Sequence, residues 1–339
     1  MSGKRIEVRE ARRLAEAALV AAGASSESAA VTARALVAAE VDGQPGHGLS
    51  RVASYALQLR AGKVDGKAHP VVTATAPAAL GIDARNGFAY PAIELAIARL
   101  VPMARASGIA AAGIRGSHHF GQAGRHVERL ADEGLIAIAC ANSPRAMAFH
   151  GGRRPMLGTN PIAFAAPVAG RPPLVVDMAL SAGARARIIA AKTSGQPIPP
   201  GWAVDAYGQP TTDAAAALDG ALLPVGGAKG SALALMVEIL VGALAGGAYG
   251  WEASSLFDGN GGPPRLGHLL IAISPEAFGH TGFAARMDAL LAAVAGEAPA
   301  RLPGDKRLEG RMRAATAGIE IPASLYAELC ELSGTTAAA

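Results

Sequence analysis

The start of the chain carries apolar residues at helical spacing, separated by glycine-rich breaks. The stripe over residues 8–22 predicts an amphipathic helix, which Gly23 ends. A second helix is predicted over residues 26–41 and a third over residues 49–62. Between these two helices, residues 42–48 form a glycine-rich corner that contains a histidine. The chain therefore opens with a helical segment.

From residue 71 onward, short β-type runs alternate with helical stripes. The predicted strands cover residues 71–75, 79–83, 109–114, 135–141, 162–166, 174–177 and 269–273. The predicted helices cover residues 91–106, 122–132, 184–192, 213–218, 230–245 and 283–295. Strands that alternate with helices predict the α/β class.

The longest apolar run, residues 231–249, holds Glu238 near its middle. A charge at the centre of a bilayer costs roughly 3 kcal/mol on insertion scales, so we predict a buried core helix and no membrane span. Residues 1–10 are polar and charged, unlike a signal peptide. Cys140 and Cys330 lack the spacing of a disulfide framework or a metal site, which favours a reducing compartment. A cytoplasmic protein is predicted.

Composition and charge narrow the expected ligands. The formal net charge of the 339 residues is +4, and the basic residues are scattered, so nucleic-acid binding is not expected. A mild positive balance suits a small anionic substrate. Aromatic residues make up only 4% of the chain, and its many alanines bury little area each, so we expect an oligomer that buries further surface.

His47 is the first candidate for chemistry. Glycines flank it on both sides, and its imidazole titrates near neutrality, so it can give a proton to a carbonyl oxygen as hydride reaches the carbon. Arg51 lies one helical turn downstream, and its guanidinium can bind a carboxylate through two hydrogen bonds. The competing interpretation is a helix-capping histidine beside a surface arginine.

The turn Arg115–Gly121 lies between a predicted strand and a predicted helix, where backbone N–H groups and the helix dipole suit a phosphate. The G-x-G-x-x-G fingerprint occurs nowhere in the chain, so a Rossmann dinucleotide site is not supported. His118 and His119 are adjacent but lack cysteine or acidic partners at ligand spacing. No metal site is predicted.

Three further turns carry candidate groups. Thr159 lies in the tight connection Gly158–Pro161. Asp177 ends a predicted strand, where α/β proteins place ligand sites, although it can equally cap a helix. Lys229 opens the helix over residues 230–245, where a cation is unfavourable unless an anion binds there. The order Lys-Gly-Ser differs from that of a Walker A loop.

Together these segments resemble the type-2 malate/L-lactate dehydrogenase family. That family also includes sulfolactate, ureidoglycolate and diketogulonate oxidoreductases and the ketimine reductases of Δ1-piperideine-2-carboxylate and Δ1-pyrroline-2-carboxylate. The likeness covers nearly the whole chain up to Gly310, with the motifs in the same order and at similar spacing. The segments that carry it are Asp42-Gly43, His47-Gly48 with Arg51, Ser117–Gly121, Gly158–Pro161, Asp177–Ala179, Gly226–Gly230 and Leu302–Gly304.

The resemblance implies an α/β fold distinct from the Rossmann fold, with the nicotinamide cofactor in an unusual α/β domain. It also implies a homodimer whose active sites lie near the subunit interface. The expected division is an N-terminal helical segment over residues 1–65, a main α/β domain over residues 66–115 and 230–339, and a cofactor-binding domain over residues 116–229. The helical segment is expected to contribute the catalytic histidine.

The same resemblance implies roles for individual residues. His47 is the expected proton donor, Arg51 the carboxylate anchor and Thr159 a substrate contact. The expected cofactor contacts are His119, Phe120, Gly121, Gln122, Ala123, Asp177, Met178, Ala179, Lys229, Pro303 and Gly304.

Two positions depart from the family pattern. Many relatives carry serine where this chain has Gly46, and the ketimine reductases carry aspartate at the position that corresponds to Arg187. Those two residues are thought to relay charge to the histidine. Arg185 and Arg187, with Arg51, could instead bind a second anionic group of the substrate, such as a distal carboxylate or a sulfonate.

These features favour NAD(P)-dependent interconversion of a small 2-keto acid and a 2-hydroxy acid of the malate, lactate or sulfolactate type. The alternatives are a ketimine reductase and a cofactor-binding relative without turnover. NADPH and NADH both remain open, and the basic balance favours NADPH.

Overall fold

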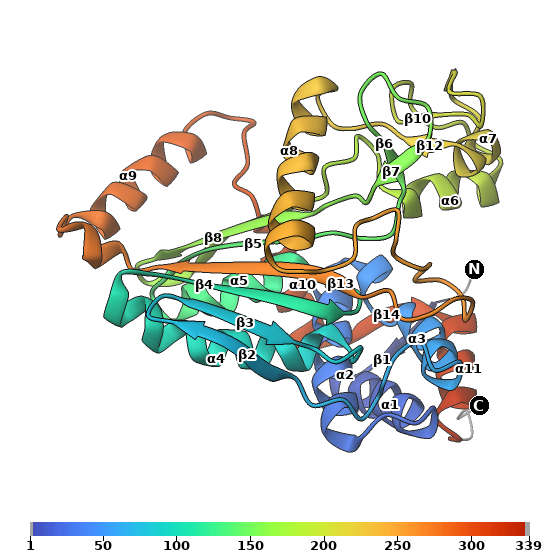
Figure 1. The fold of residues 1–339 in the computed structure, drawn as a ribbon, viewed down its shortest axis with the longest axis horizontal. Helices are drawn as coiled ribbons and strands as arrows, with labels where there is room; N and C mark the ends of the chain where they lie inside the picture. Colours follow the sequence, from blue (N-terminus) through green and yellow to red (C-terminus); the bar gives the residue numbers. More distant parts are fainter. Residues whose placement is uncertain (1–2, 336–339) are drawn as a thin grey trace.

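The computed structural model describes residues 3–335 and is organised around one large twisted sheet (Figure 1). The sheet has seven strands in the order β2-β3-β4-β13-β5-β8-β9. Their bounds are β2 Val71–Ala76, β3 Ala79–Asp83, β4 Ile109–Ser117, β5 Ile136–Ala141, β8 Ile162–Val168, β9 Arg171–Met178 and β13 Leu266–Ile273.

Almost every neighbouring pair of strands in this sheet is antiparallel, and β3 with β4 is the parallel pair. A Rossmann domain has a mostly parallel sheet, so this topology is a different one. The predicted α/β class and the non-Rossmann fold are therefore confirmed.

Helices α4 (Ala89–Ser107) and α5 (Ala123–Asp132) pack on one face of the large sheet. Small side chains dominate this interface, including Ala96 and Ala112, which are fully buried. Alanine buries little area per residue, but it lets helix and sheet approach closely. Ile93, Ile114 and other buried aliphatic residues fill the remaining space.

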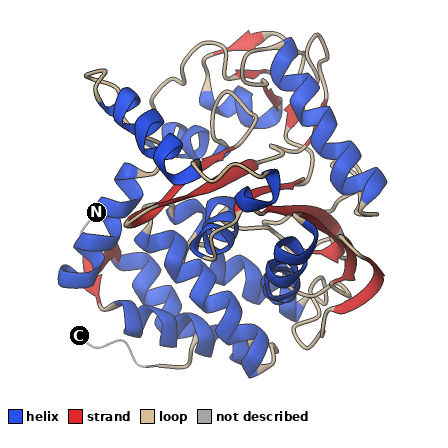
Figure 2. Cartoon of the chain, turned by 90° about the vertical axis from the view of Figure 1, so that its left-hand side faces the viewer, coloured by secondary structure: helices blue, strands red, loops and turns tan. Residues whose placement is uncertain are grey.

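The N-terminal helices form a second core together with the end of the chain. It combines α1 (Val8–Ala21), α2 (Ser26–Val41), α3 (Arg51–Arg60) and α11 (Ala323–Leu332). Strand β1 (Gly3–Ile6) pairs with β14 (Ile319–Pro322), so the first and last strands close this bundle together. Both termini lie beside it (Figure 2). Helix α10 (Asp305–Ala317) packs against α2, and its Arg311 pairs with Glu128 of α5 at 2.7 Å.

A smaller sheet with the order β11-β10-β12-β6-β7 forms the third part. Its strands are β6 Met147–Ala148, β7 Pro155–Leu157, β10 Ala203–Val204, β11 Pro210–Thr211 and β12 Ala221–Leu222. It shares a core with helices α6 (Arg185–Ser194), α7 (Ala214–Asp219) and α8 (Ala228–Glu238). The domain boundaries given by the resemblance stay a prediction.

The apolar run after residue 230 forms α8 and a π-helical turn, η2 (Ile239–Leu244). The prediction of a buried core helix is wrong for one side of it, because Met236 is 56% exposed and Leu244 is 69% exposed. No helix within residues 3–335 is long and apolar enough to cross a membrane. Helix α9 (Phe283–Ala295) projects from the body of the molecule (Figure 1).

Candidate active site

His47 ends a short 3-10 helix, η1 (Pro45–His47), between α2 and α3. It does not cap the following helix, because the Leu49 amide at that end donates instead to Glu40 Oε2 at 2.8 Å. Its Nδ1 is buried and has no hydrogen-bond partner within the described residues. The capping interpretation is therefore wrong, and the imidazole is left available for a ligand.

The ring of His119 stacks on that of His47, with centroids 5.2 Å apart and planes 17° apart. Tyr55 from α3 fixes the His119 ring through a hydrogen bond of 2.7 Å between its hydroxyl and Nδ1. The Tyr55 hydroxyl also lies 3.4 Å from that of Tyr90. Two segments distant in sequence thus meet as a pair of stacked imidazoles.

Burial, followed by the positive charge of Arg51, lowers the pKa of His47 to about 4. The same two causes lower the pKa of His119 well below its usual value. Both rings are therefore neutral at neutral pH in the ligand-free protein. A neutral imidazole can accept a proton, and an anion bound to Arg51 would offset the charge that lowers the pKa of His47.

Arg51 is the first residue of α3 and is half-buried. Its Nε donates to the carbonyl oxygen of Gly46 at 2.6 Å, and its guanidinium carbon lies 4.8 Å from the ring centre of Phe257. The part of the chain that the structure describes offers no hydrogen bond to its two terminal nitrogens. These two donors can receive both oxygens of a carboxylate.

Several predicted cofactor contacts lie together at the start of α5. The Asp177 carboxylate accepts from the Gly124 amide at 2.8 Å, so this helix end already has a negative partner. Burial raises the pKa of Asp177, while that hydrogen bond and Arg307 oppose the rise. Gln122 donates from Nε2 to Asp42 Oδ2 at 2.8 Å. Asp177 is thus a capping residue within the candidate cofactor region.

The loop that contains Pro303 and Gly304 closes the same region. Gly304 has a φ of 97°, a backbone conformation that favours glycine, and it lies against the Arg307 guanidinium. Gln122 Oε1 and Arg307 Nε are buried without hydrogen-bond partners inside residues 3–335. A polar ligand that reached these groups would satisfy them, and a nicotinamide cofactor carries polar groups of this kind, although Arg307 Nε also lies 3.8 Å from Asp42 Oδ2.

Thr159 and the segment before Lys229 both lie beside the residues that follow β9. The amide of Leu180, just after Asp177–Ala179, donates to the Thr159 carbonyl oxygen at 2.8 Å. Leu180 in turn accepts from the Val225 amide at 2.8 Å, which places the segment before Lys229 beside it. The side chains of Met178 and Lys229 are exposed, so both are accessible to a ligand.

The first turn of α6 lies next to the histidine corner. A Cβ on Gly46 would lie 3.8 Å from that of Ala186, which is an ordinary contact, so the corner has room for a serine. Arg185 is half-buried and Arg187 is exposed. The charge that lowers the pKa of His47 comes from Arg51, and Arg187 contributes no such effect.

Sequence patterns did not reveal the residues that support the site. Tyr55, Gln58 and Lys63 are fully buried on or just after α3. Gln58 Oε1 accepts from His118 Nε2 at 2.7 Å. A buried lysine and a buried glutamine in one helical stretch are unusual, and that polarity is the signal that could have marked them. Phe257 had no local signal, because its contact with Arg51 is long-range.

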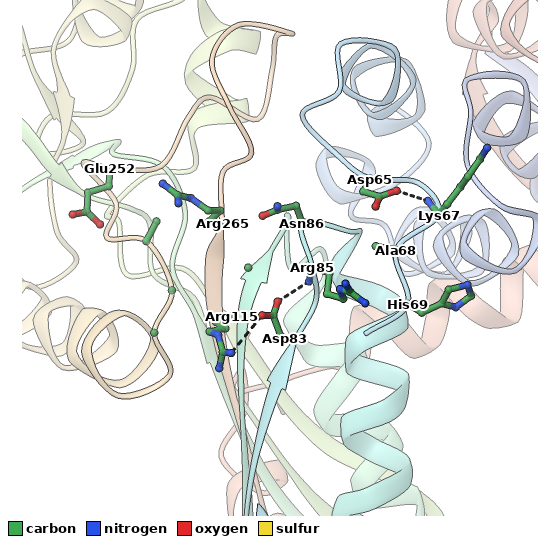
Figure 3. Close-up of a pocket in the computed structure, with 14 residues that line it drawn as sticks. Asp65, Lys67, Ala68, His69, Asp83, Arg85, Asn86, Arg115, Glu252 and Arg265 are labelled. Carbon is green, nitrogen blue, oxygen red and sulfur yellow. Dashed lines mark hydrogen bonds and ion pairs between the residues drawn. The ribbon is translucent and has the colours of Figure 1, made fainter. Parts of the chain in front are cut away.

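A different cavity, of about 890 Å³, contains none of the expected catalytic, substrate or cofactor residues, although Arg115 and Gly116 of the candidate phosphate turn line it (Figure 3). It is lined by side chains such as Arg85, Arg115 and Arg265. Arg115 pairs with Asp83 at 3.4 Å, and the Arg85 amide binds the same carboxylate at 2.8 Å. Its volume alone therefore does not make it the candidate active site.

The antiparallel-sheet fold, the imidazole without a hydrogen-bond partner among the described residues and the arginine with free terminal nitrogens suit an oxidoreductase-type site built outside a Rossmann domain. The family model described as malate/L-lactate dehydrogenase matches residues 6–330. The chain belongs to this family and is an oxidoreductase.

Relatives of the chain include a sulfolactate dehydrogenase and reductases of cyclic imine carboxylates. A (2R)-3-sulfolactate dehydrogenase (NADP(+)) from Chromohalobacter salexigens is 48% identical over 324 residues, or 96% of each chain. A Δ1-pyrroline-2-carboxylate reductase from Ancylobacter novellus is 41% identical over 96% of each chain. The structure of a Δ1-piperideine-2-carboxylate reductase from Pseudomonas syringae superposes with a TM-score of 0.92 at 41% identity, covering 97% of this chain and 99% of that one.

Proposed function

We propose that this enzyme interconverts a small 2-keto acid and the corresponding 2-hydroxy acid, with His47 as proton donor and acceptor and Arg51 as carboxylate anchor. The observation that carries this proposal is that, within residues 3–335, the His47 imidazole has no hydrogen-bond partner and the terminal nitrogens of Arg51, four residues later, are free. The first provides acid–base chemistry and the second orients the carboxylate next to the reacting carbon.

When bound, the nicotinamide cofactor supplies or accepts the hydride. In oxidation, neutral His47 accepts the hydroxyl proton. In reduction, the substrate carboxylate on Arg51 offsets the second of the two causes that lower the pKa of His47, the first being burial, and so favours the protonated ring that donates to the oxygen. Substrate binding thus prepares the acid that the reaction needs.

The proposed cofactor is NADPH, bound near His119–Ala123, Asp177–Ala179, Lys229 and the Pro303 loop. Two observations support it: the relative from Chromohalobacter uses NADP(+), and the buried guanidinium of Arg307 keeps one nitrogen without a hydrogen bond to the described residues, although that nitrogen lies 3.8 Å from Asp42 Oδ2. Guanidinium groups bind phosphate well. Michaelis constants for NADPH and NADH would test this preference, and equal or lower values for NADH would contradict it.

Ketimine reduction is the second candidate, because several relatives are cyclic-imine carboxylate reductases. Gly46 and Arg187 stand where the serine and aspartate of the supposed relay are expected, which favours the keto acid. Arg185 and Arg187 can then bind the distal anion of a diacid or sulfonate.

Oxidation of NADPH and NADH with oxaloacetate, pyruvate, sulfopyruvate and the two cyclic imines distinguishes these activities. We expect turnover with at least one keto acid. Turnover with the imines alone contradicts the keto-acid proposal. Tight cofactor binding without any turnover on the panel would indicate the cofactor-binding relative.

We also propose a homodimer with its active sites near the interface. The exposed apolar side of α8 and η2, which includes Leu235, Met236 and Ile239, supports it, because monomers rarely expose such a surface. Light scattering should give twice the monomer mass, and a fully active monomer at micromolar concentration contradicts the dimer. The cytoplasmic location stays a prediction.

A further inference from the structure

The loop over residues 254–260, here called the α3 loop, packs along helix α3 and is held there by hydrogen bonds. Lys63 is fully buried, and its ammonium group donates to the carbonyl oxygens of Ser255 at 2.7 Å and Asp258 at 3.1 Å. At Gly259 the loop approaches so closely that a Cβ would lie 3.1 Å from that of Ala61. A buried lysine is costly unless its donors are paired, so this loop has a defined position.

A second buried side chain connects the α3 loop to the histidine segment. Gln58 Nε2 donates to the carbonyl oxygen of Leu256 at 2.8 Å, while Gln58 Oε1 accepts from His118 Nε2 at 2.7 Å. His118 directly precedes His119, whose ring stacks on that of His47. The loop and the stacked imidazoles are therefore held by the same helix.

The loop places one large apolar side chain at the candidate site. Phe257 is 56% exposed, although its neighbour Leu256 is buried, so core packing does not account for it. Its ring lies under the guanidinium of Arg51 at 4.8 Å. The hydrogen bond from Nε to the Gly46 carbonyl oxygen fixes one edge of the Arg51 guanidinium, and the Phe257 ring covers one of its faces.

We propose that Phe257 is a positioning residue that holds Arg51 so that its two terminal nitrogens receive the substrate carboxylate end-on. The inference rests on the proposed function, in which Arg51 anchors that carboxylate. The aromatic face attracts the cation, and the Gly46 carbonyl fixes its rotation. Phe257 therefore acts on substrate affinity through Arg51, without taking part in proton transfer.

The test compares Phe257→Ala, Phe257→Leu and Phe257→Tyr with a matched control, Phe278→Ala. Phe278 is 66% exposed on η3 (Pro275–Phe278), in a different part of the chain. A cation–π contact at an exposed site contributes enough for about a two- to fivefold change in affinity. We expect Phe257→Ala and Phe257→Leu to raise the substrate KM by this factor with kcat within twofold. Phe257→Tyr and Phe278→Ala should leave KM unchanged.

The decisive comparison repeats Phe257→Ala in an Arg51→Met background. If Phe257 acts through Arg51, its substitution there no longer changes KM. An equal increase in both backgrounds overturns the proposal, and so does a leucine variant that matches wild type. Melting temperatures identify variants that merely unfold, and Phe257→Leu then carries the test.

Calorimetric titration with oxalate in the presence of NADPH measures carboxylate binding to Arg51 without turnover. Oxalate should bind about two- to fivefold more weakly to Phe257→Leu than to wild type. If wild type turns over none of the keto acids or imines, the proposed function fails, while a weaker oxalate titration still supports the role of Phe257. If turnover is normal and oxalate binding is unchanged, only the role of Phe257 fails.

Discussion

The corner around His47 and the cavity of Figure 3 are both lined by nitrogen-bearing side chains, but they differ in solvation. At the corner, burial lowers the pKa of His47 to about 4 and that of His118 to about 3. In the cavity, Arg115 and Asp83 pair with 40% and 31% of their side chains exposed. Water screens such exposed ion pairs, so they contribute little to the stability of the fold.

The difference shows what marks a chemical site in this molecule. Removal of water changes the proton affinity of the histidines and leaves His47 Nδ1 without a partner. The cavity of Figure 3 is large, but its charged groups are already solvated by water or paired with one another. Perturbed proton affinity near a free ligand-binding group is thus the better guide to function.

Substitution at the corner should give the largest effect. We expect His47→Asn to lower kcat by about 10²–10⁴-fold, because a positioned acid–base group typically contributes that much. Cofactor Kd should change far less than kcat, since His47 reaches the expected cofactor contacts only through its stacking on His119. Steady-state kinetics with the best substrate of the panel, together with cofactor titration, measure both. A kcat within about threefold of wild type would refute the assignment of His47.

The next effect concerns the anchor. Arg51→Lys keeps the charge but loses the planar fork and the hydrogen bond to the Gly46 carbonyl oxygen. Hydrogen bonds to charged groups contribute about 1.5–3 kcal/mol, so the substrate KM should rise by about ten- to hundredfold. We expect kcat to change less than KM. If kcat falls while KM is constant, Arg51 acts in the chemical step and not as an anchor.

The sequence predicted those parts of the fold whose signals are local. Helix α2 begins at Ser26, where the sequence predicted it, and Ser25 caps it by accepting from the Ser28 amide at 3.2 Å. Strands of two residues, such as β10 and β12, show no periodicity and were not predicted. The pairing of β1 with β14 joins the two ends of the chain, and no local pattern reports it.

The same distinction holds for the candidate site. His47 and Arg51 lie four residues apart, so their spacing and the flanking glycines were sufficient to propose them. His119 and Asp177 were candidates because of their places at strand ends, but their roles as cofactor contacts came only from the resemblance to the family. Phe257 and Lys63 depend on a loop far along the chain, and their contacts exist only once the tertiary structure forms.

Acid should destabilise the protein through the buried histidines. The pKa of His126 is lowered to about 4 and that of His268 to about 3, in both cases chiefly by burial, against an ordinary value of 6.5. Below pH 6.5 the unfolded chain therefore binds protons that the folded chain does not, so stability falls as the pH drops from 6.5 toward 4. Each group contributes roughly 1.4 kcal/mol per pH unit across its window.

Denaturant unfolding of wild type and His268→Gln between pH 4 and 7 measures this loss. The variant removes one titrating group, so its stability should depend less steeply on pH. The exposed residue His280 provides a matched control, and His280→Gln should keep the slope of wild type. Identical slopes for all three proteins would show that His268 is protonated equally in the folded and unfolded chains.

The smallest effect is expected in the cavity of Figure 3, where Arg85 projects from an exposed turn. The backbone amide of Arg85, and not its guanidinium, binds Asp83, so Arg85→Gln keeps the local hydrogen bond of 2.8 Å. Its φ of 54° is left-handed, a conformation that glutamine adopts at about the same cost as arginine. We therefore expect kcat/KM within about twofold of wild type and a stability change within about 0.5 kcal/mol, as for other surface substitutions. Kinetics and denaturant unfolding measure the two quantities. A tenfold loss of kcat/KM in a stably folded Arg85→Gln protein would show that the charged cavity takes part in catalysis or substrate entry despite its solvation. The contrast drawn between the two regions would then be wrong.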